Sequence, residues 1–260
     1  MRPLVEWQPD ETIGVFTDID DTLTTEGAIT PDALQALADL KEAGLHVVPV
    51  TGRPVGWSEP FAQNWPVDAI VAENGAVALV HTDGQPMRKI YLQDAATRAA
   101  NFARMQQVLA RIEREIPGAR RSHDSAGRET DIAIDHSEFT RLSQTAINAV
   151  VLLMQAEGMT ATVSSIHING WYGTHDKLAG ARWIVRELFG RDLDAELDRW
   201  VYVGDSPNDQ VMFRHFGHSV GVANIRQLTG QLAHPPRYIT KAERGAGFAE
   251  LASHLLRTRK

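Results

Sequence analysis

Residues 12–22 read Thr-Ile-Gly-Val-Phe-Thr-Asp-Ile-Asp-Asp-Thr, an apolar run followed directly by an acidic turn. The apolar half predicts a buried β-strand, and the acidic half predicts a turn at the carboxyl end of that strand. In an open α/β sheet, ligands bind at this end of the strands. Three adjacent carboxylates repel one another unless a cation or a shared proton relieves the charge, and a helix cap or an Asx turn would explain only one of them. The segment therefore predicts a strand that delivers Asp18 and Asp20 to a functional site, with Asp21 as a structural residue.

Strands and helices alternate on either side of this segment. Thr30-Pro31-Asp32 predicts the start of a helix that Gly44 ends, because threonine is a good N-cap and proline fits the first helical turn. Apolar periodicity predicts further strands at 46–50, 69–72, 200–203 and 220–223 and helices at 177–189 and 208–216. This order predicts the α/β class, with a Rossmann-like parallel-sheet core that has helices on both faces.

The middle of the chain has a different pattern. A hairpin with its turn at Asp83-Gly84 is followed by a long amphipathic helix, and a second helix lies between two alternating strands at 130–135 and 160–168. Residues 82–172 are therefore predicted to form an inserted α+β cap domain that sets substrate specificity. Residues 1–81 and 173–260 then form the two parts of the catalytic core.

Composition excludes several classes of protein. The 260 residues contain no cysteine, which excludes disulfides, thiolate zinc sites and a cysteine nucleophile. The net charge of -7 argues against a nucleic-acid partner, which would need a basic face. The apolar runs are far shorter than the roughly 20 residues of a membrane helix, and the N-terminus lacks a signal-peptide pattern. We therefore expect a cytoplasmic protein without a membrane partner; the sequence does not indicate its oligomeric state.

A second acidic turn, Gly204-Asp205-Ser206-Pro207-Asn208-Asp209, ends another apolar strand. Two acidic turns on neighbouring strands would form an oxygen-rich pocket suited to Mg²⁺, which would need an anionic co-ligand such as phosphate. Thr51-Gly52-Arg53, after the strand at 46–50, offers a hydroxyl and a backbone amide to that phosphate. Lys177 stands at the start of a helix, where the helix dipole disfavours a cation unless an anion lies nearby.

The order of these motifs resembles that of the haloacid dehalogenase (HAD) superfamily of phosphatases. Asp-x-Asp-x-Thr at 18–22 is followed by Thr-Gly-Arg at 51–53, Lys177 and the turn at 204–209. In addition, Glu73-Asn74-Gly75-Ala76 resembles the signature of members with a type-IIB cap. Many of those members have glycine where this chain has Asp21, for which the resemblance implies no role.

The resemblance implies a role for each matching residue. Asp18 would be the nucleophile that forms an aspartyl-phosphate and a ligand of Mg²⁺. Asp20 would be the general acid/base, and its backbone carbonyl would also bind the metal. Asp205 would be the third protein ligand, and Asp209 would hold a metal-bound water or brace the lysine. The groups expected to bind the transferring phosphoryl group are Thr51, Gly52, Lys177 and Asn208.

The predicted cap carries polar residues that could contact a substrate: His123, Arg128, His167 and Asn169. His167 and Asn169 occupy alternate positions of one strand and would share a face. The alternative is that His167 is a structural histidine whose hydrogen bonds are satisfied. The segment 166–170 is loosely similar to mannosyl-3-phosphoglycerate phosphatases, but this likeness is too short to name a substrate. The class of substrate that we expect is a sugar phosphate or a phosphorylated sugar acid.

The sequence thus predicts a Mg²⁺-dependent hydrolase of phosphomonoesters that acts on a small phosphorylated metabolite. One alternative is a phosphomutase that returns the phosphoryl group to another hydroxyl of a sugar phosphate. Another is a non-catalytic sensor of a phosphorylated ligand, for which the second acid, Asp20, would be unnecessary.

Overall fold

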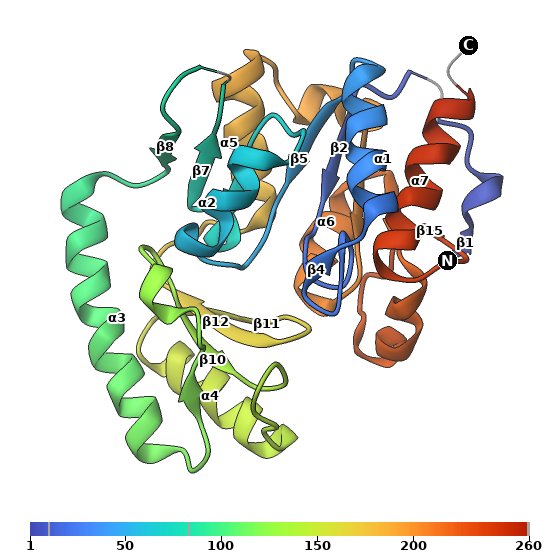
Figure 1. The fold of residues 1–260 in the computed structure, drawn as a ribbon. Coiled ribbons are helices and arrows are strands. Elements are labelled where there is room, and N and C mark those ends of the chain that lie inside the picture. The colour runs from blue at the N-terminus through green and yellow to red at the C-terminus, as the bar shows by residue number, and fades with distance from the viewer. Residues whose placement is uncertain (10, 83, 259–260) are drawn as a thin grey trace.

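The computed structural model describes residues 1–9, 11–82 and 84–258 and contains a parallel sheet of six strands (Figure 1). The strand order is β1-β15-β14-β13-β2-β5, and each neighbouring pair is parallel. Their bounds are β1 Arg2–Pro3, β2 Gly14–Thr17, β5 His46–Pro49, β13 Trp200–Gly204, β14 His218–Gly221 and β15 Tyr238–Ile239. The strands that precede the two acidic turns, β2 and β13, are therefore neighbours at the centre of the sheet.

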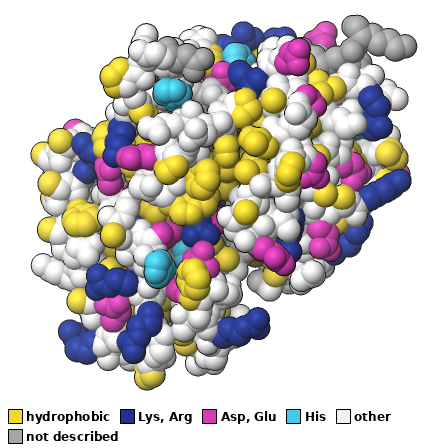
Figure 2. All heavy atoms as spheres, in the orientation of Figure 1, with side chains coloured by type: hydrophobic (Ala, Val, Ile, Leu, Met, Phe, Trp, Pro, Cys, Tyr) yellow, Lys and Arg dark blue, Asp and Glu magenta, His cyan; other side chains and the backbone are white. Residues whose placement is uncertain are grey.

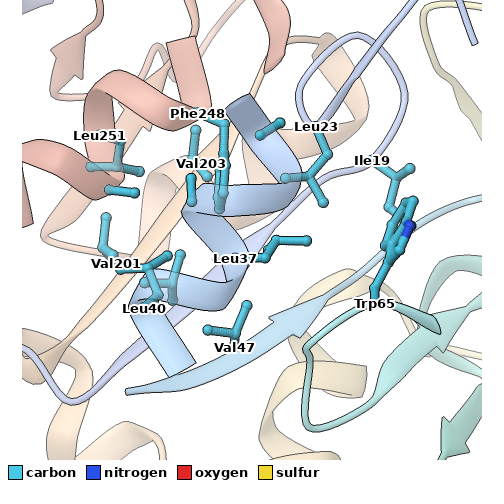
Figure 3. Packing of buried hydrophobic residues seen from close by; sticks show 14 of the residues in the cluster. Ile19, Leu23, Leu37, Leu40, Val47, Trp65, Val201, Val203, Phe248 and Leu251 are labelled. Atoms are coloured by element: carbon cyan, nitrogen blue, oxygen red, sulfur yellow. The ribbon is translucent and has the colours of Figure 1, made fainter. Parts of the chain in front are cut away.

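Helices cover both faces of this sheet, as predicted. Helices α1 (Pro31–Glu42) and α7 (Arg244–Thr258) pack on one face, where Leu37 and Phe248 meet Val203 (Figure 3). Helices α5 (Lys177–Phe189) and α6 (Gln210–His215) pack on the other face. Successive residues of a buried strand point to opposite faces, so each face receives its own apolar layer.

Three of the predicted core elements differ in detail, and the strand predicted at 160–168 is instead two paired strands, Thr160–Val163 and His167–Trp171. Thr30 is the N-cap of α1, but its side chain makes no capping hydrogen bond. The helix expected at 208–216 begins as a 3₁₀ turn, Pro207–Asp209, because Ser206 and Asp209 form a capping box there. The strand expected at 220–223 lies two residues earlier, because its register is set by pairing with β13 and β15.

A smaller antiparallel sheet lies beside β5. It contains β6 (Ile70–Ala72), β7 (Val77–Val80) and β8 (Arg88–Tyr91), is joined to the core by a parallel bridge from Val50 to Val71, and packs against α2 (Val55–Asn64). The predicted boundary at residue 82 assigned β8 to the insertion, whereas β8 pairs with β7 on the core side. Asp83, predicted in the turn between them, lies outside the described residues.

The second α+β unit, which we call the cap, follows β8. Its antiparallel sheet has the order β11-β12-β10-β9, and helices α3 (Ala95–Glu115) and α4 (Gln144–Ala156) share an apolar cluster with that sheet. The strand bounds are β9 Arg120–Arg121, β10 Ile132–Asp135, β11 Thr160–Val163 and β12 His167–Trp171. Charged and histidine side chains gather where the cap meets the core (Figure 2). The division into two domains remains a prediction.

The remaining elements are short. They are the hairpin β3 (Thr24–Thr25) and β4 (Ala28–Ile29) and the 3₁₀ turns Leu4–Glu6, Glu73–Gly75, Ser125–Gly127, Asp194–Arg199, Pro207–Asp209 and Ala223–Gln231. Among the described helices, none has both the length and the apolar character needed to cross a membrane.

Candidate active site

The carboxylates of the two acidic turns meet at the carboxyl edge of the central sheet. Asp18 follows β2 and Asp205 follows β13, and these strands pair in parallel register. Asp18, Asp205 and Asp209 each place a carboxylate oxygen within 4.8 Å of the others, and all three residues are buried. The parallel pairing of β2 and β13 is the physical reason why residues almost two hundred positions apart share one pocket.

Lys177 connects two of these carboxylates. Its ammonium donates to Oδ1 of Asp18 at 2.6 Å and to Oδ1 of Asp209 at 2.7 Å, and the side chain is almost wholly buried. Burial opposes the charge of the lysine, but the two carboxylates more than offset it and raise the pKa of Lys177 above its usual range. These carboxylates are the anions that explain a lysine at the N-terminus of α5. We call Asp18, Lys177, Asp205 and Asp209 the catalytic cluster.

Asp209 already has several hydrogen-bond partners within the protein. Oδ1 accepts from Lys177 and from the Tyr202 hydroxyl, while Oδ2 accepts from the backbone N–H groups of Asp205 and Ser206 at 3.0 and 3.1 Å. Of the two roles that the resemblance implied for Asp209, this arrangement favours the brace of Lys177 over the binding of a metal-bound water.

Asp205 is the carboxylate that the protein leaves incompletely paired. Its Oδ2 accepts from the side-chain amide of Asn224 at 3.1 Å, but its Oδ1 has no hydrogen-bond partner although it is buried. Burial, reinforced by Asp18 and Asp209, raises the pKa of Asp205 well above its usual range. Burial likewise raises the pKa of Asp18 to about 7, even though Lys177 opposes the shift. The unpaired oxygen and the excess of negative charge fit a hard divalent cation such as Mg²⁺.

Asp20 lies next to the catalytic cluster, but its side chain is turned toward Arg53. The guanidinium donates from Nε and Nη2 to both carboxylate oxygens of Asp20, at 2.9–3.1 Å. The expected metal contact of Asp20 therefore rests on its backbone carbonyl, as the resemblance implied, and remains a prediction. Asp21 adopts a left-handed backbone conformation, and its carboxylate faces Arg244 at 3.1 Å.

The expected phosphate-binding residues lie around this cluster with partners of their own. Thr51 is fully buried, and its hydroxyl accepts from the backbone N–H of Arg53 at 3.0 Å. The carbonyl of Gly52 accepts hydrogen bonds from the cap. Asn208 lines a cavity of about 410 Å³ together with Lys177. Their roles toward phosphate remain predictions.

Three of the four polar cap residues lie at the junction with the core. Arg128 and Asn169 both donate to the carbonyl of Gly52, at 3.1 and 3.2 Å, and both bind Asp131. The Nε2 atom of His167 lies 2.8 Å from Glu138. His123 instead is exposed and contacts Phe139, with ring centroids 5.5 Å apart and the rings tilted by 49°. The cap face that was expected to contact substrate is thus largely engaged in holding the cap to the core.

Glu73 has a structural role that sequence reasoning did not assign. Its buried carboxylate accepts from the backbone N–H groups of Val55 and Glu129, each at 3.0 Å, and from the N–H and hydroxyl of Thr130. One side chain therefore joins the start of α2 to a loop of the cap. Within the signature that resembled a type-IIB cap, Glu73 therefore holds the cap against the core.

Other acidic residues at the junction were also missed, because no short motif marks them. Asp124 and Glu138 each contact Arg53, which lies 71 and 85 positions away in the sequence. We call the whole set the junction cluster: Arg53, Glu73, Asp124, Arg128, Asp131, Glu138, His167 and Asn169. A cavity of about 360 Å³ lies between cap and core and is lined by Asp205, Asn224 and Ser164, among others.

A family model described as haloacid dehalogenase-like hydrolase matches residues 15–155. A search of curated proteins finds no match.

Three solved structures share the fold over nearly the whole chain. A Thermoplasma acidophilum protein has a TM-score of 0.71 at 15% identity and covers 94% of this chain and 98% of its own. The sucrose-phosphatase of Synechocystis, in complex with sucrose and phosphate, has a TM-score of 0.67 at 14% identity, with coverage of 94% and 98%. A subclass IIB sugar phosphatase has a TM-score of 0.62 at 16% identity, again with coverage of 94% and 98%.

Proposed function

This chain belongs to the haloacid dehalogenase-like hydrolases, and we propose that it is a Mg²⁺-dependent phosphomonoesterase acting on a small phosphorylated metabolite. The family match confirms the predicted family and the prediction of an enzyme, and the shared fold confirms the predicted architecture of a Rossmann-like core with a cap. The metal, the aspartyl-phosphate and the class of substrate are the proposed parts.

The observation that carries the proposal is the unpaired oxygen of Asp205 beside the bond between Asp18 and Lys177. A buried carboxylate oxygen with no donor calls for a cation, and the ammonium of Lys177 at 2.6 Å from Asp18 offers positive charge to a phosphoryl oxygen. Asp18, Asp205 and the backbone carbonyl of Asp20 are the groups that would hold Mg²⁺, whose charge when bound would offset that of the phosphoryl oxygens.

The proposed reaction has two steps. A carboxylate oxygen of Asp18 attacks phosphorus, the ester P–O bond breaks, and the acid form of Asp20 gives its proton to the leaving alcohol. Water then attacks the phosphorus of the aspartyl-phosphate, and Asp20 takes a proton from that water. The bond between the Asp18 oxygen and phosphorus breaks, which restores the Asp18 carboxylate and releases inorganic phosphate. Lys177 supports both steps by neutralising charge, because phosphoryl transfer depends mainly on positioning and electrostatic stabilisation.

The space around the site supports a small substrate. The cavity of about 360 Å³ between cap and core suits a metabolite, and a macromolecule would have to displace the cap. Its lining is rich in amides and hydroxyls, including Asn148, Ser164 and Asn224, which pair well with alcohol groups. Together with the two sugar-phosphatase structures of similar fold, this supports a sugar phosphate or a phosphorylated sugar acid.

The test is phosphate release from p-nitrophenyl phosphate and a panel of sugar phosphates, with Mg²⁺ and with EDTA. We expect release that requires Mg²⁺ and that is lost in Asp18→Asn. Release that persists in this variant would overturn Asp18 as the nucleophile. Conversion of a sugar phosphate to its isomer without free phosphate would identify a phosphomutase, and tight binding without turnover would identify a sensor.

A further inference from the structure

Arg53 contacts carboxylates from both the core and the cap. Besides its bidentate contact with Asp20, its Nη1 donates to Asp124 at 3.2 Å and its Nη2 donates to Glu138 at 2.8 Å. The arginine side chain is only 7% exposed, and its guanidinium lies 4.8 Å from the ring of Trp57. Arg53 is therefore the direct link between the cap and the carboxylate proposed to handle protons.

The two cap carboxylates are themselves held in place. Asp124 accepts from the hydroxyl of Ser122 at 2.6 Å and from Arg128 at 3.1 Å. Glu138 contacts His167 through its second oxygen, and its backbone N–H donates to Asp135 at 2.9 Å. Although burial opposes ionisation, the hydrogen bonds from His167 and Arg53 lower the pKa of Glu138, so it meets Arg53 as a carboxylate. The contact is thus built from groups with fixed positions.

We propose that Arg53, held by Asp124 and Glu138, is a positioning residue that aims the Asp20 carboxyl group at the leaving alcohol. Proton transfer to the substrate would then depend on the seated cap, because two of the three carboxylates around Arg53 belong to it. This inference rests on the proposed phosphatase function. Arg53, Asp124 and Glu138 touch no reacting atom themselves. Their role is to hold Asp20, which does.

The chemistry of the leaving group provides a specific test. When the Asp18–phosphorus bond forms and the ester bond breaks, an alkyl alcohol needs the proton of Asp20, because an alkoxide leaves poorly. A p-nitrophenolate leaves without that proton. Loss of positioning should therefore slow the hydrolysis of alkyl phosphates but not that of p-nitrophenyl phosphate. Loss of folding or of phosphate binding would slow the hydrolysis of both substrates.

The experiment measures kcat/KM for p-nitrophenyl phosphate and for the best sugar phosphate of the panel, in the wild-type enzyme and in variants. Because kcat/KM covers only the steps up to departure of the alcohol, it omits hydrolysis of the aspartyl-phosphate. We expect Arg53→Lys to lower the sugar-phosphate value about 100-fold and Glu138→Gln about tenfold, with less than about threefold change for p-nitrophenyl phosphate. The ratio of the two substrates on one sample is independent of the folded fraction.

A double variant and a matched control complete the design. In the Arg53→Lys background, Glu138→Gln should add little further loss, because Glu138 acts through Arg53. Glu113→Gln removes a cap carboxylate that pairs with Arg121 within the cap. It should leave kcat/KM unchanged for both substrates. An equal loss on both substrates, or no loss on either, would overturn the inference. A wild-type enzyme inactive on p-nitrophenyl phosphate would instead overturn the proposed function, and the inference with it.

Discussion

The catalytic cluster and the junction cluster are both buried and acidic, yet they differ in how completely their charges are paired. In the junction cluster, Glu73 accepts hydrogen bonds at both of its oxygens, and Asp131 binds Arg128 and Asn169. In the catalytic cluster, Oδ1 of Asp205 has no donor, and among the described residues it is the one buried carboxylate oxygen of which this is true. The hydrogen bonds of the junction cluster are thus complete within the protein, whereas the catalytic cluster keeps one buried carboxylate oxygen unpaired.

Complete pairing suits a cluster that holds the cap against the core, whereas incomplete pairing suits a cluster that binds a ligand. A fully paired polar network fixes one arrangement of cap and core, because breaking any contact leaves a buried group unsatisfied. An incompletely paired cluster costs stability in the free protein and makes that free energy available for binding a cation and a phosphate. Removal of a paired charge from either cluster should therefore lower the free energy of unfolding, whereas removal of the incompletely paired charge of Asp205 should raise it.

The largest expected effect comes from Lys177→Met, which would leave Asp18 and Asp209 buried without their cation. Removal of one partner from a buried ion pair costs about 3–5 kcal/mol. We expect a fall of that size in the free energy of unfolding, measured with urea in EDTA at pH 7. Unchanged stability would show that the lysine is not the main counterion of this cluster.

Glu73→Gln tests the junction cluster. An amide has one oxygen where the carboxylate has two, so buried donors of Val55, Glu129 or Thr130 would lose their partner. We expect a loss of about 2–3 kcal/mol in the free energy of unfolding. The Glu113→Gln variant should change it by less than about 0.5 kcal/mol, since its ion pair is on the surface of the cap. Equal effects of Glu73→Gln and Glu113→Gln on the free energy of unfolding would contradict the structural role assigned to the junction cluster.

Asp124→Asn tests a pH dependence of the junction cluster that the wild type should have and the variant should lack. Although burial favours the neutral form, Arg128 lowers the pKa of Asp124 from its ordinary 3.8 to about 2. Because the folded pKa is depressed, the stabilisation is complete above the ordinary value and disappears as pH falls toward 2. The shift corresponds to about 2 kcal/mol at pH 7. Unfolding curves of wild type and variant should therefore converge between about pH 4 and pH 2, and a constant difference would contradict this origin.

Asp205→Asn should have the smallest effect and the opposite sign. Because the folded protein raises the pKa of Asp205, ionisation of this group costs stability once pH exceeds its ordinary 3.8. The neutral amide removes that cost, so we expect a gain of about 1 kcal/mol in EDTA. Mg²⁺ should raise the unfolding temperature of the wild type but not of the variant. A destabilised variant in EDTA would mean that the charge of Asp205 is already compensated.

The sequence by itself determined the elements whose pattern is local. The helix predicted at 177–189 has those bounds in the structure, because its apolar stripe is continuous and Gly190 ends it in a left-handed conformation. The strands at the two acidic turns were also predictable, since an apolar run that ends in aspartates has few other interpretations. Asp18, Asp205 and Lys177 could therefore be named before their contacts were known.

Tertiary structure alone decided which charges meet. Nothing in the local sequence indicates that Arg53 binds Glu138, or that Glu73 receives the backbone of a cap loop, because these contacts depend on how the cap sits on the core. The same holds for β8, whose pairing with β7 is a contact that the local sequence does not specify. Periodicity reports which face of an element is buried, but pairing between distant charges follows from burial and geometry that only the assembled fold provides.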